Sequence, residues 1–233
     1  MPPARVRTHV RRARSTPVAS RWRCAPAVQA RSRETVTLFA RATEDLLRGR
    51  SFEEIGVQDI VRRAGRPIGS FYARFGSKEA LLPLLYQRYH DGLGAQVAAR
   101  LARIPWTKLD FVRTVEAFVE FVIGIYSERP WLIRALALFA RSRPEALPPD
   151  LVEQRRAVYE PVNAVLLRHR ARFAHPDPGA AVRFTVFLAL SVAREKLLFA
   201  EAPQSRLTPM RRAALRDELV RVVHAYLTTE APR

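Results

Sequence analysis

The 233-residue sequence lacks features on which several classes of protein depend. Its one cysteine, Cys24, excludes a disulfide framework and a cysteine-based structural zinc site. No apolar run reaches the roughly 18–20 residues that a membrane helix needs. The densest run, 184–193, lies between Arg183 and Arg194. Glycine is scarce, and no alternation of apolar and polar residues is long enough for a strand. We therefore predict an all-α globular protein with no membrane partner.

The motifs of common enzymes and metal sites are also missing. The five histidines form no His-Glu-x-x-His pair, and there is no Gly-x-Ser-x-Gly elbow, P-loop or dinucleotide fingerprint. Carboxylate pairs such as Glu53-Glu54 and Asp217-Glu218 are typical of solvated helix ends. The sequence thus predicts a protein that is not an enzyme and that holds no metal and no cofactor.

Positive charge is present in excess and is unevenly distributed. The net charge is +18, and residues 1–30 contribute +7 of it through seven arginines and no acidic residue. Residues 31–90 carry +4 and residues 91–233 carry +7. We interpret 1–30, which also holds four prolines and Cys24, as a disordered basic arm. Two interpretations of the arm remain open. It is either a solvated tail, or residues added by an upstream start codon, or else it is a segment that binds phosphate.

From residue 31 onward, helical periodicity dominates. Apolar residues of 36–47 follow the i, i+3, i+4, i+7 rule, and Gly49 ends that stretch. A short helix is expected at 57–64, after an N-cap at Gly56. Further helices are expected at 67–75, 77–89, 107–126, 130–140, 150–173, 178–200 and 209–227. Pro67 would lie just inside the first of these, where proline is tolerated. Pro83 and Pro161 should kink the helices at 77–89 and 150–173.

The segment 55–82 has a more specific pattern than two short helices and a turn. Its matching features are Asp59-Ile60, Ala64-Gly65, Gly69-Ser70-Phe71-Tyr72, Phe75 and Ser77-Lys78-Glu79-Ala80-Leu81. This pattern resembles the N-terminal helix-turn-helix domain of the tetracycline-repressor family of bacterial regulators. The resemblance covers about 31–90, and the rest of the chain is similar only in being helical and of suitable length.

A recognition helix presents its N-terminal side chains to base edges and phosphates. Arg66, Pro67, Ile68, Gly69 and Ser70 stand at that position. The resemblance implies phosphate contacts by Tyr72 and Lys78, and we expect Arg74 to bind phosphate where the family often has histidine. Gly56 replaces a common threonine, so Gln58 is a possible substitute contact. Phe71 and Phe75, four residues apart, are expected in the core.

The resemblance implies two domains after the arm: a DNA-binding domain at 31–91 and a regulatory and dimerisation domain at 92–233. The last two long helices would pair with those of a second copy. The residues available for that contact are Phe184, Phe187, Leu188, Ser191, Leu215, Leu219, Val222, Val223 and Tyr226, some of which must face the subunit's own core. The candidate residues of an effector pocket are Phe118, Phe121, Ile125, Trp131, Phe139 and Tyr159, for which core packing is the alternative.

These features predict a homodimeric, sequence-specific transcription regulator in the bacterial cytoplasm, associated with the nucleoid. The expected mode is a repressor that a small hydrophobic effector releases from a palindromic double-stranded DNA operator. The alternative is a sequence-tolerant, nucleoid-type basic protein that binds DNA through the arm 1–30.

Overall fold

The fold consists of helices that form two groups at opposite ends of the molecule. The computed structural model describes residues 30–230, so the predicted arm, Cys24 included, lies outside the described residues except for Ala30. Within that range every regular element is helical, as the sequence predicts. The α-helices are α1 (Ala30–Leu46), α2 (Val57–Ala64), α3 (Ile68–Tyr72), α4 (Leu81–Leu101), α5 (Phe111–Ser127), α6 (Pro130–Ser142), α7 (Leu151–Leu167), α8 (Pro178–Leu198), α9 (Pro203–Arg206) and α10 (Arg212–Thr228).

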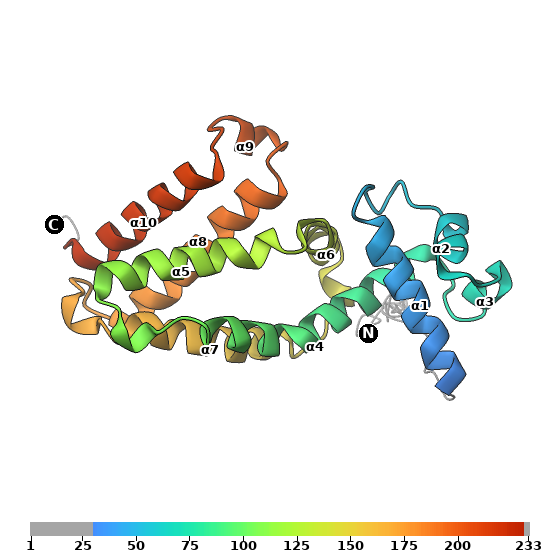
Figure 1. The fold of residues 1–233 in the computed structure, drawn as a ribbon, viewed down its shortest axis with the longest axis horizontal. Helices are drawn as coiled ribbons and strands as arrows, with labels where there is room; N and C mark the ends of the chain where they lie inside the picture. The colour runs from blue at the N-terminus through green and yellow to red at the C-terminus, as the bar shows by residue number, and fades with distance from the viewer. Residues whose placement is uncertain (1–29, 231–233) are drawn as a thin grey trace, which may run out of the picture.

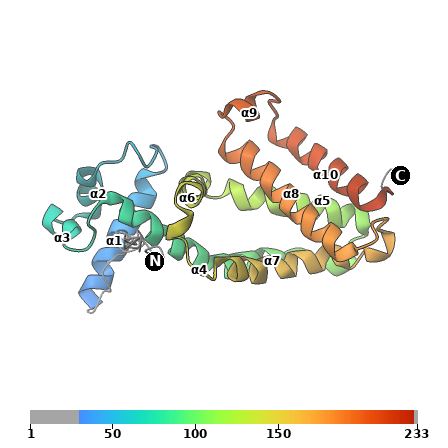
Figure 2. The ribbon, with the colours of Figure 1, turned by 180° about the vertical axis from the view of Figure 1, so that it is seen from behind.

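Helix α4 connects the two groups. Figure 1 shows α1, α2 and α3 at one end of the molecule and α5, α8 and α10 at the other, with α4 running out from the first group beside α7. The view from behind shows the same separation (Figure 2). The predicted domain boundary at residue 91 falls inside α4, so the two groups share a continuous helix.

Each group has its own hydrophobic core. The first core contains Phe39, Phe71 and Phe75, all without exposed surface, together with Leu81 and Leu85 of α4. The second core lies among α4, α5, α7, α8 and α10 and includes Val119, Val122 and Leu166. Helix α6 belongs mainly to the first core, because Leu132, Leu136 and Phe139 are buried there. Helix α6, which follows α5 in the chain, is therefore packed directly on the helix-turn-helix group.

Two helix starts depend on an aspartate. The Asp177 carboxylate accepts a hydrogen bond from the Ala180 N–H at 2.9 Å, and α8 follows, as predicted. The Asp110 carboxylate accepts one from the Arg113 N–H at 2.8 Å. The predicted start of that helix at residue 107 was therefore wrong: α5 begins after Asp110, and Trp106–Lys108 forms a separate 3₁₀ turn.

Other boundaries also differ from the sequence predictions. Helix α7 ends at Leu167, because Arg170–Arg172 forms its own 3₁₀ turn. The start predicted at 209 was wrong: α10 begins at Arg212, after the short and unforeseen α9.

Helix α4 begins at Leu81, after a 3₁₀ turn at Lys78–Ala80, and it continues well past the predicted end at residue 89. Pro83 consequently lies in the first turn of α4, where a backbone N–H has no intrahelical partner. Proline at this position removes no hydrogen bond of the helix.

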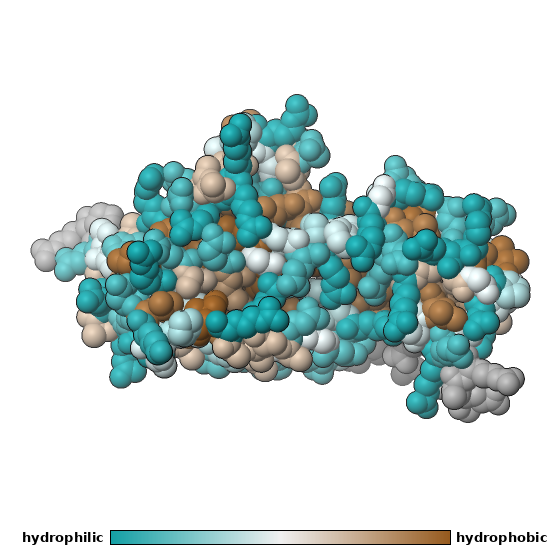
Figure 3. Space-filling model, viewed as in Figure 1, coloured by the Kyte–Doolittle hydropathy of each residue, from teal (hydrophilic) through white to brown (hydrophobic). Residues whose placement is uncertain are grey.

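No helix within residues 30–230 combines the length and hydropathy needed to cross a bilayer. The same residues bring together no group of three His, Cys, Asp or Glu side chains suited to a metal ion. The visible face is mostly hydrophilic, and apolar atoms gather at the end where α3 lies and over the middle of the molecule around α8 (Figure 3).

Candidate functional site

Helix α2 begins at an N-cap that has no side chain. Gly56 is extended (φ −88°, ψ 158°) and occupies the predicted N-cap position. The Asp59 carboxylate accepts a hydrogen bond from the Gly56 N–H at 3.2 Å and another from Arg50 Nη2 at 2.9 Å. These bonds, that of Gly56 first, hold the pKa of Asp59 below its usual range, so the group is ionised at neutral pH. They tie the start of α2 to the preceding loop.

The turn between α2 and α3 depends on Gly65. Its φ of 62° and ψ of 38° lie in the left-handed region, which residues with a Cβ rarely adopt. The Arg66 N–H donates to the Val61 carbonyl at 3.1 Å and closes the end of α2. Pro67 is the N-cap of α3 (φ −63°, ψ 148°), so its predicted place inside the helix was wrong by one position. The fixed φ of proline suits an extended cap as well as a first turn.

Helix α3 ends at Tyr72, earlier than the predicted end at residue 75. A hydrogen bond from the Phe75 N–H to the Phe71 carbonyl, at 2.9 Å, continues the turn just beyond it. The Phe39 ring lies 5.3 Å from that of Phe71 and 6.0 Å from that of Phe75, centre to centre and edge to face. The predicted core positions of Phe71 and Phe75 are confirmed, and they brace α3 against α1.

This packing leaves one side of α3 exposed. Tyr72 is 54% exposed and Ile68 44% exposed, while Pro67 and Gly69 are exposed beside them. Gln58, in the first turn of α2, is exposed as well. Within residues 30–230 the Tyr72 hydroxyl has no hydrogen-bond partner, so it is free to donate. These residues form an exposed surface at the outer end of the molecule.

Three other predicted DNA contacts already have partners within the protein. The Arg66 guanidinium lies 3.6 Å from the Glu34 carboxylate. The Ser70 hydroxyl donates to the Pro67 carbonyl at 2.7 Å, and Arg74 Nη1 donates to the Ser70 carbonyl at 3.5 Å. Arg66 must leave Glu34 to reach DNA, whereas Ser70 keeps its acceptor capacity where it is.

Lys78 lies against the loop that leads into α2. Its Nζ donates to the carbonyls of Phe52 at 3.0 Å, Glu53 at 2.9 Å and Ile55 at 2.9 Å. An ammonium group has three hydrogens, and these bonds engage all of them. The phosphate contact that the resemblance implies stays a prediction, and it requires Lys78 to release a carbonyl.

A cavity of about 250 Å³ lies among α4, α5, α6, α7 and α8. Two predicted pocket residues, Ile125 and Tyr159, line it. Phe118 and Phe121 do not, because both are buried in the second core. Trp131 and Phe139 line a different space, described below.

The polar groups of this cavity are mostly donors. Arg155 of α7 and Arg194 of α8 line it, and Arg155 Nη2 donates to the Tyr86 hydroxyl at 2.8 Å. Burial, followed by the neighbouring Tyr159, raises the pKa of Tyr89 to about 12, so its hydroxyl keeps its proton at neutral pH. Burial, followed by Arg155, lowers the pKa of His90 to about 4, so this imidazole is neutral.

Residues 40–85, which include α2, the turn and α3, match the family model described as bacterial regulatory proteins, tetR family. The chain carries a TetR-family DNA-binding domain. No curated protein matches the chain significantly. The assignment of this domain to the TetR family therefore depends on residues 40–85, the same segment that forms the helix-turn-helix.

Solved structures extend the TetR likeness to the fold of the whole described chain. The TetR-family regulator PfmR from Thermus thermophilus is 18% identical, with a TM-score of 0.51 over 84% of this chain and 99% of that one. A TetR-family regulator from Streptomyces coelicolor is 20% identical, with a TM-score of 0.52 over 83% and 80%. The fatty acid degradation regulator FadR from Bacillus halodurans is 13% identical, with a TM-score of 0.53 over 85% and 97%. At these identities the likeness concerns the fold alone.

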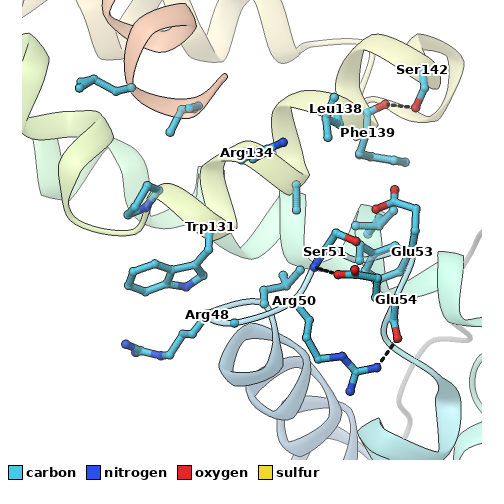
Figure 4. Close-up of a pocket in the computed structure, with 18 residues that line it drawn as sticks. Arg48, Arg50, Ser51, Glu53, Glu54, Trp131, Arg134, Leu138, Phe139 and Ser142 are labelled. Carbon is cyan, nitrogen blue, oxygen red and sulfur yellow. Dashed lines mark hydrogen bonds between the residues drawn. The ribbon is translucent and has the colours of Figure 1, made fainter. Parts of the chain in front are cut away.

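The TetR-type domain meets α6 and the C-terminal end of α8 at a second space of about 450 Å³. Trp131 and Phe139 of α6 face the α1–α2 loop across it (Figure 4). The Arg48 guanidinium lies 4.7 Å from the Trp131 ring centre, and Arg50 donates to the Glu54 carbonyl. Its arginines are accompanied by Glu53 and Glu54, so this groove has no strong excess of one charge.

The sequence-based prediction missed most of the polar residues of the cavity, including Tyr86, His90, Arg155 and Arg194. A signal for them exists in the helical spacing. Tyr86 and His90 are four residues apart, as are Arg155 and Tyr159, so each pair shares one helix face. An arginine on the inward face of a helix is a stronger marker of a binding cavity than an aromatic side chain, which is common in any core.

Proposed function

We propose that this protein is a DNA-binding transcription regulator that acts as a homodimeric repressor on a palindromic operator. The observation that carries the proposal is the braced helix-turn-helix of residues 56–75, whose exposed side presents Ile68 and Tyr72. Acting on DNA places the protein in the bacterial cytoplasm with the nucleoid. Catalysis has no part in this proposal.

In the proposed complex, the N-terminal end of α3 enters the major groove. Ile68 and Pro67 make apolar contact with thymine methyl groups, and Arg66 reaches a base edge or a phosphate. The Tyr72 hydroxyl donates to a phosphate, and Gln58 and Arg74 contact the backbone on either side. Gly69 allows close approach, since nothing lies within 4 Å of the position that a Cβ would occupy there.

Apolar side chains on α8 and α10 support dimerisation. Phe184, Phe187 and Val222 are exposed, and the Phe184 and Tyr226 rings lie 5.3 Å apart across the two helices. In contrast, Leu215, Leu219 and Val223 are buried in the subunit's own second core, as predicted for part of this set. The remaining exposed residues offer a second copy a self-complementary apolar face.

The proposed effector site is the cavity among α4–α8, which a small molecule with an apolar body would fill. Leu136 of α6 lines this cavity and is also buried in the first core, next to the helix-turn-helix group. Tyr86 and His90 place α4 at the same cavity. An effector that binds one arrangement of α4 and α6 more tightly would shift the spacing of the two DNA-binding domains.

Selection from random double-stranded fragments at physiological salt tests the proposal. The repressor hypothesis predicts enrichment of an inverted repeat by the full-length protein and by a variant that lacks residues 1–29. The alternative, a sequence-tolerant basic protein, is favoured by the +7 charge of the arm. It predicts binding without enrichment that is lost when the arm is removed.

A further inference from the structure

The wall of the α4–α8 cavity carries an unbalanced positive charge. Arg155 and Arg194 line it, and none of its lining residues is an aspartate or a glutamate. Within residues 30–230, neither arginine forms an ion pair, although many surface arginines of the same region do. Both arginines are only partly exposed, and a partly buried guanidinium without a counter-charge has no ion pair to offset its lost hydration, so its retention calls for another reason.

Both guanidinium groups also have unused hydrogen-bond donors. The Nε atoms of Arg155 and Arg194 are buried and have no partner. Arg155 Nη2 donates to the Tyr86 hydroxyl at 2.8 Å and lies 3.4 Å from His90 Nε2, so Arg155 is held in place from α4. Both groups that hold it are neutral and leave its charge uncompensated.

Tyrosine hydroxyls add further donors around the same space. Tyr126 and Tyr159 line the cavity, and burial raises the pKa of each above its ordinary value. Within the described residues, neither hydroxyl is hydrogen-bonded to another residue. Protonated hydroxyls beside two guanidinium groups form a site suited to an acceptor with negative charge.

The geometry points to a small aromatic carboxylate as the effector, its carboxylate bound by Arg155 and Arg194. This inference rests on the proposed function, since it names the ligand class of the proposed effector site. The planar fork of a guanidinium matches the two oxygens of a carboxylate. Five aromatic rings line the wall around it, from Tyr86, Tyr89, Tyr126, Tyr159 and Phe187.

The size of the cavity limits the body of the ligand. Its volume of about 250 Å³ is below the roughly 300 Å³ at which pockets for drug-sized ligands begin. A single ring with a short side chain suits it better than a long acyl chain or a nucleotide. Leu93, Val97 and Ile133 provide apolar wall beside the aromatic rings.

The bound carboxylate would also act on α4. It competes with Tyr86 and His90 for Arg155, and both residues belong to the helix that continues from the DNA-binding domain. Binding therefore exchanges an α4–α7 contact for a ligand contact. Arg155 would thus bind the ligand and lose its contacts with Tyr86 and His90 of α4.

Calorimetry and thermal shift with 3-phenylpropionate test the inference on the full-length protein. The neutral amide of the same acid controls for the charge, and octanoate controls for the aromatic ring. The variants are Arg155→Met and Arg194→Met, with Arg194→Lys to keep the charge. Arg156→Met is the matched control, because Arg156 is the next residue of α7 and is exposed and paired with Glu153 at 3.0 Å.

We expect the acid to bind at least tenfold more tightly than its amide. Either methionine variant should remove this preference, Arg194→Lys should keep part of it, and Arg156→Met should keep all of it. Circular dichroism checks that each variant is folded. If a methionine variant is unfolded, the comparison of acid with amide on the wild-type protein still decides the question.

Equal binding of acid and amide overturns the inference, and so does the absence of binding by both at 10 mM. If octanoate binds more tightly than 3-phenylpropionate, the inference that the ligand is aromatic is overturned. These results leave operator selection unaffected, so the proposed function can stand without the ligand class. Failure of operator selection alongside acid-selective binding would instead remove the regulatory role and keep the site.

Discussion

Individual residues of the helix-turn-helix divide into those that face outward and those that hold the domain together. Tyr72 is half exposed with a free hydroxyl, whereas the Lys78 ammonium is engaged by three carbonyls. The sequence pattern treats both as phosphate contacts. Their surroundings predict different consequences when they are changed.

Tyr72→Phe removes only the hydroxyl proposed to donate to a phosphate. A hydrogen bond to a charged group contributes about 1.5–3 kcal/mol, so operator binding should weaken about tenfold or more. The salt dependence of binding should stay the same, because no positive charge is lost. Fluorescence anisotropy against the selected operator measures both. Thr107→Val, which removes an exposed hydroxyl from the turn between α4 and α5, is the control. Equal affinity of Tyr72→Phe and wild type would exclude the contact.

Lys78→Met removes the group that holds the loop before α2. We expect the free energy of unfolding to fall by about 1–3 kcal/mol, because three carbonyls lose a charged donor at a partly exposed site. Urea denaturation measures the change. Lys108→Met, at an exposed lysine far along the chain, should leave the stability nearly unchanged. Full stability of Lys78→Met together with weakened DNA binding would instead support the phosphate contact.

At the scale of the element, α2 is bounded by two glycines with different roles. Gly56 has an extended backbone, and an added Cβ meets only Asp59 Oδ2 at 3.6 Å, an ordinary contact. Gly65 has a φ of 62°, which strains any residue with a Cβ. Exposure alone does not separate them, since both are exposed.

Gly65→Ala should therefore destabilise the fold by roughly 1–2 kcal/mol, the cost of a left-handed backbone with a Cβ. Gly56→Thr should change the stability by only a few tenths of a kcal/mol. It should also tighten operator binding, because its hydroxyl restores the phosphate contact that the family resemblance associates with this position. Urea denaturation and anisotropy test the pair. A similar loss of stability in both variants would contradict the different roles assigned to Gly56 and Gly65.

The longer helices could be predicted from the sequence, but short α9 and several helix ends could not. Asp177-Pro178 marks the start of α8 correctly, because cap and first turn are adjacent. Thr208-Pro209 has the same local pattern, yet α10 begins three residues later. Lys196 Nζ donates to the Thr208 carbonyl at 2.7 Å, a contact between distant parts of the chain that holds this segment as a loop. Local signals contain no information on such a contact.

At the scale of the whole molecule, the cavity among α4–α8 lies between the proposed dimer face and the helix-turn-helix group. The sequence located the helix-turn-helix because the order of its residues is local and specific. It missed the cavity because Tyr86, Arg155 and Arg194 come from three helices that only the tertiary fold brings together. Of the predicted pocket residues, only Ile125 and Tyr159 line this space.

The apolar face of α8 and α10 leads to a prediction on assembly. Val222→Glu and Phe184→Glu each place a charge on this exposed face, so both should shift the protein from dimer to monomer. Sedimentation velocity measures the shift. Val152→Glu, at an even more exposed valine on α7, is the control and should leave the dimer intact. A wild-type monomer at operator-binding concentrations would contradict the proposed assembly.

The most direct test of the central claim is the ratio of affinities for the selected operator and for a version with one half-site scrambled. Competition at physiological salt with the full-length protein measures this ratio. A dimer that reads two half-sites through α3 predicts discrimination of at least about a thousandfold. Affinities within threefold of each other would contradict sequence-specific regulation and favour the sequence-tolerant alternative.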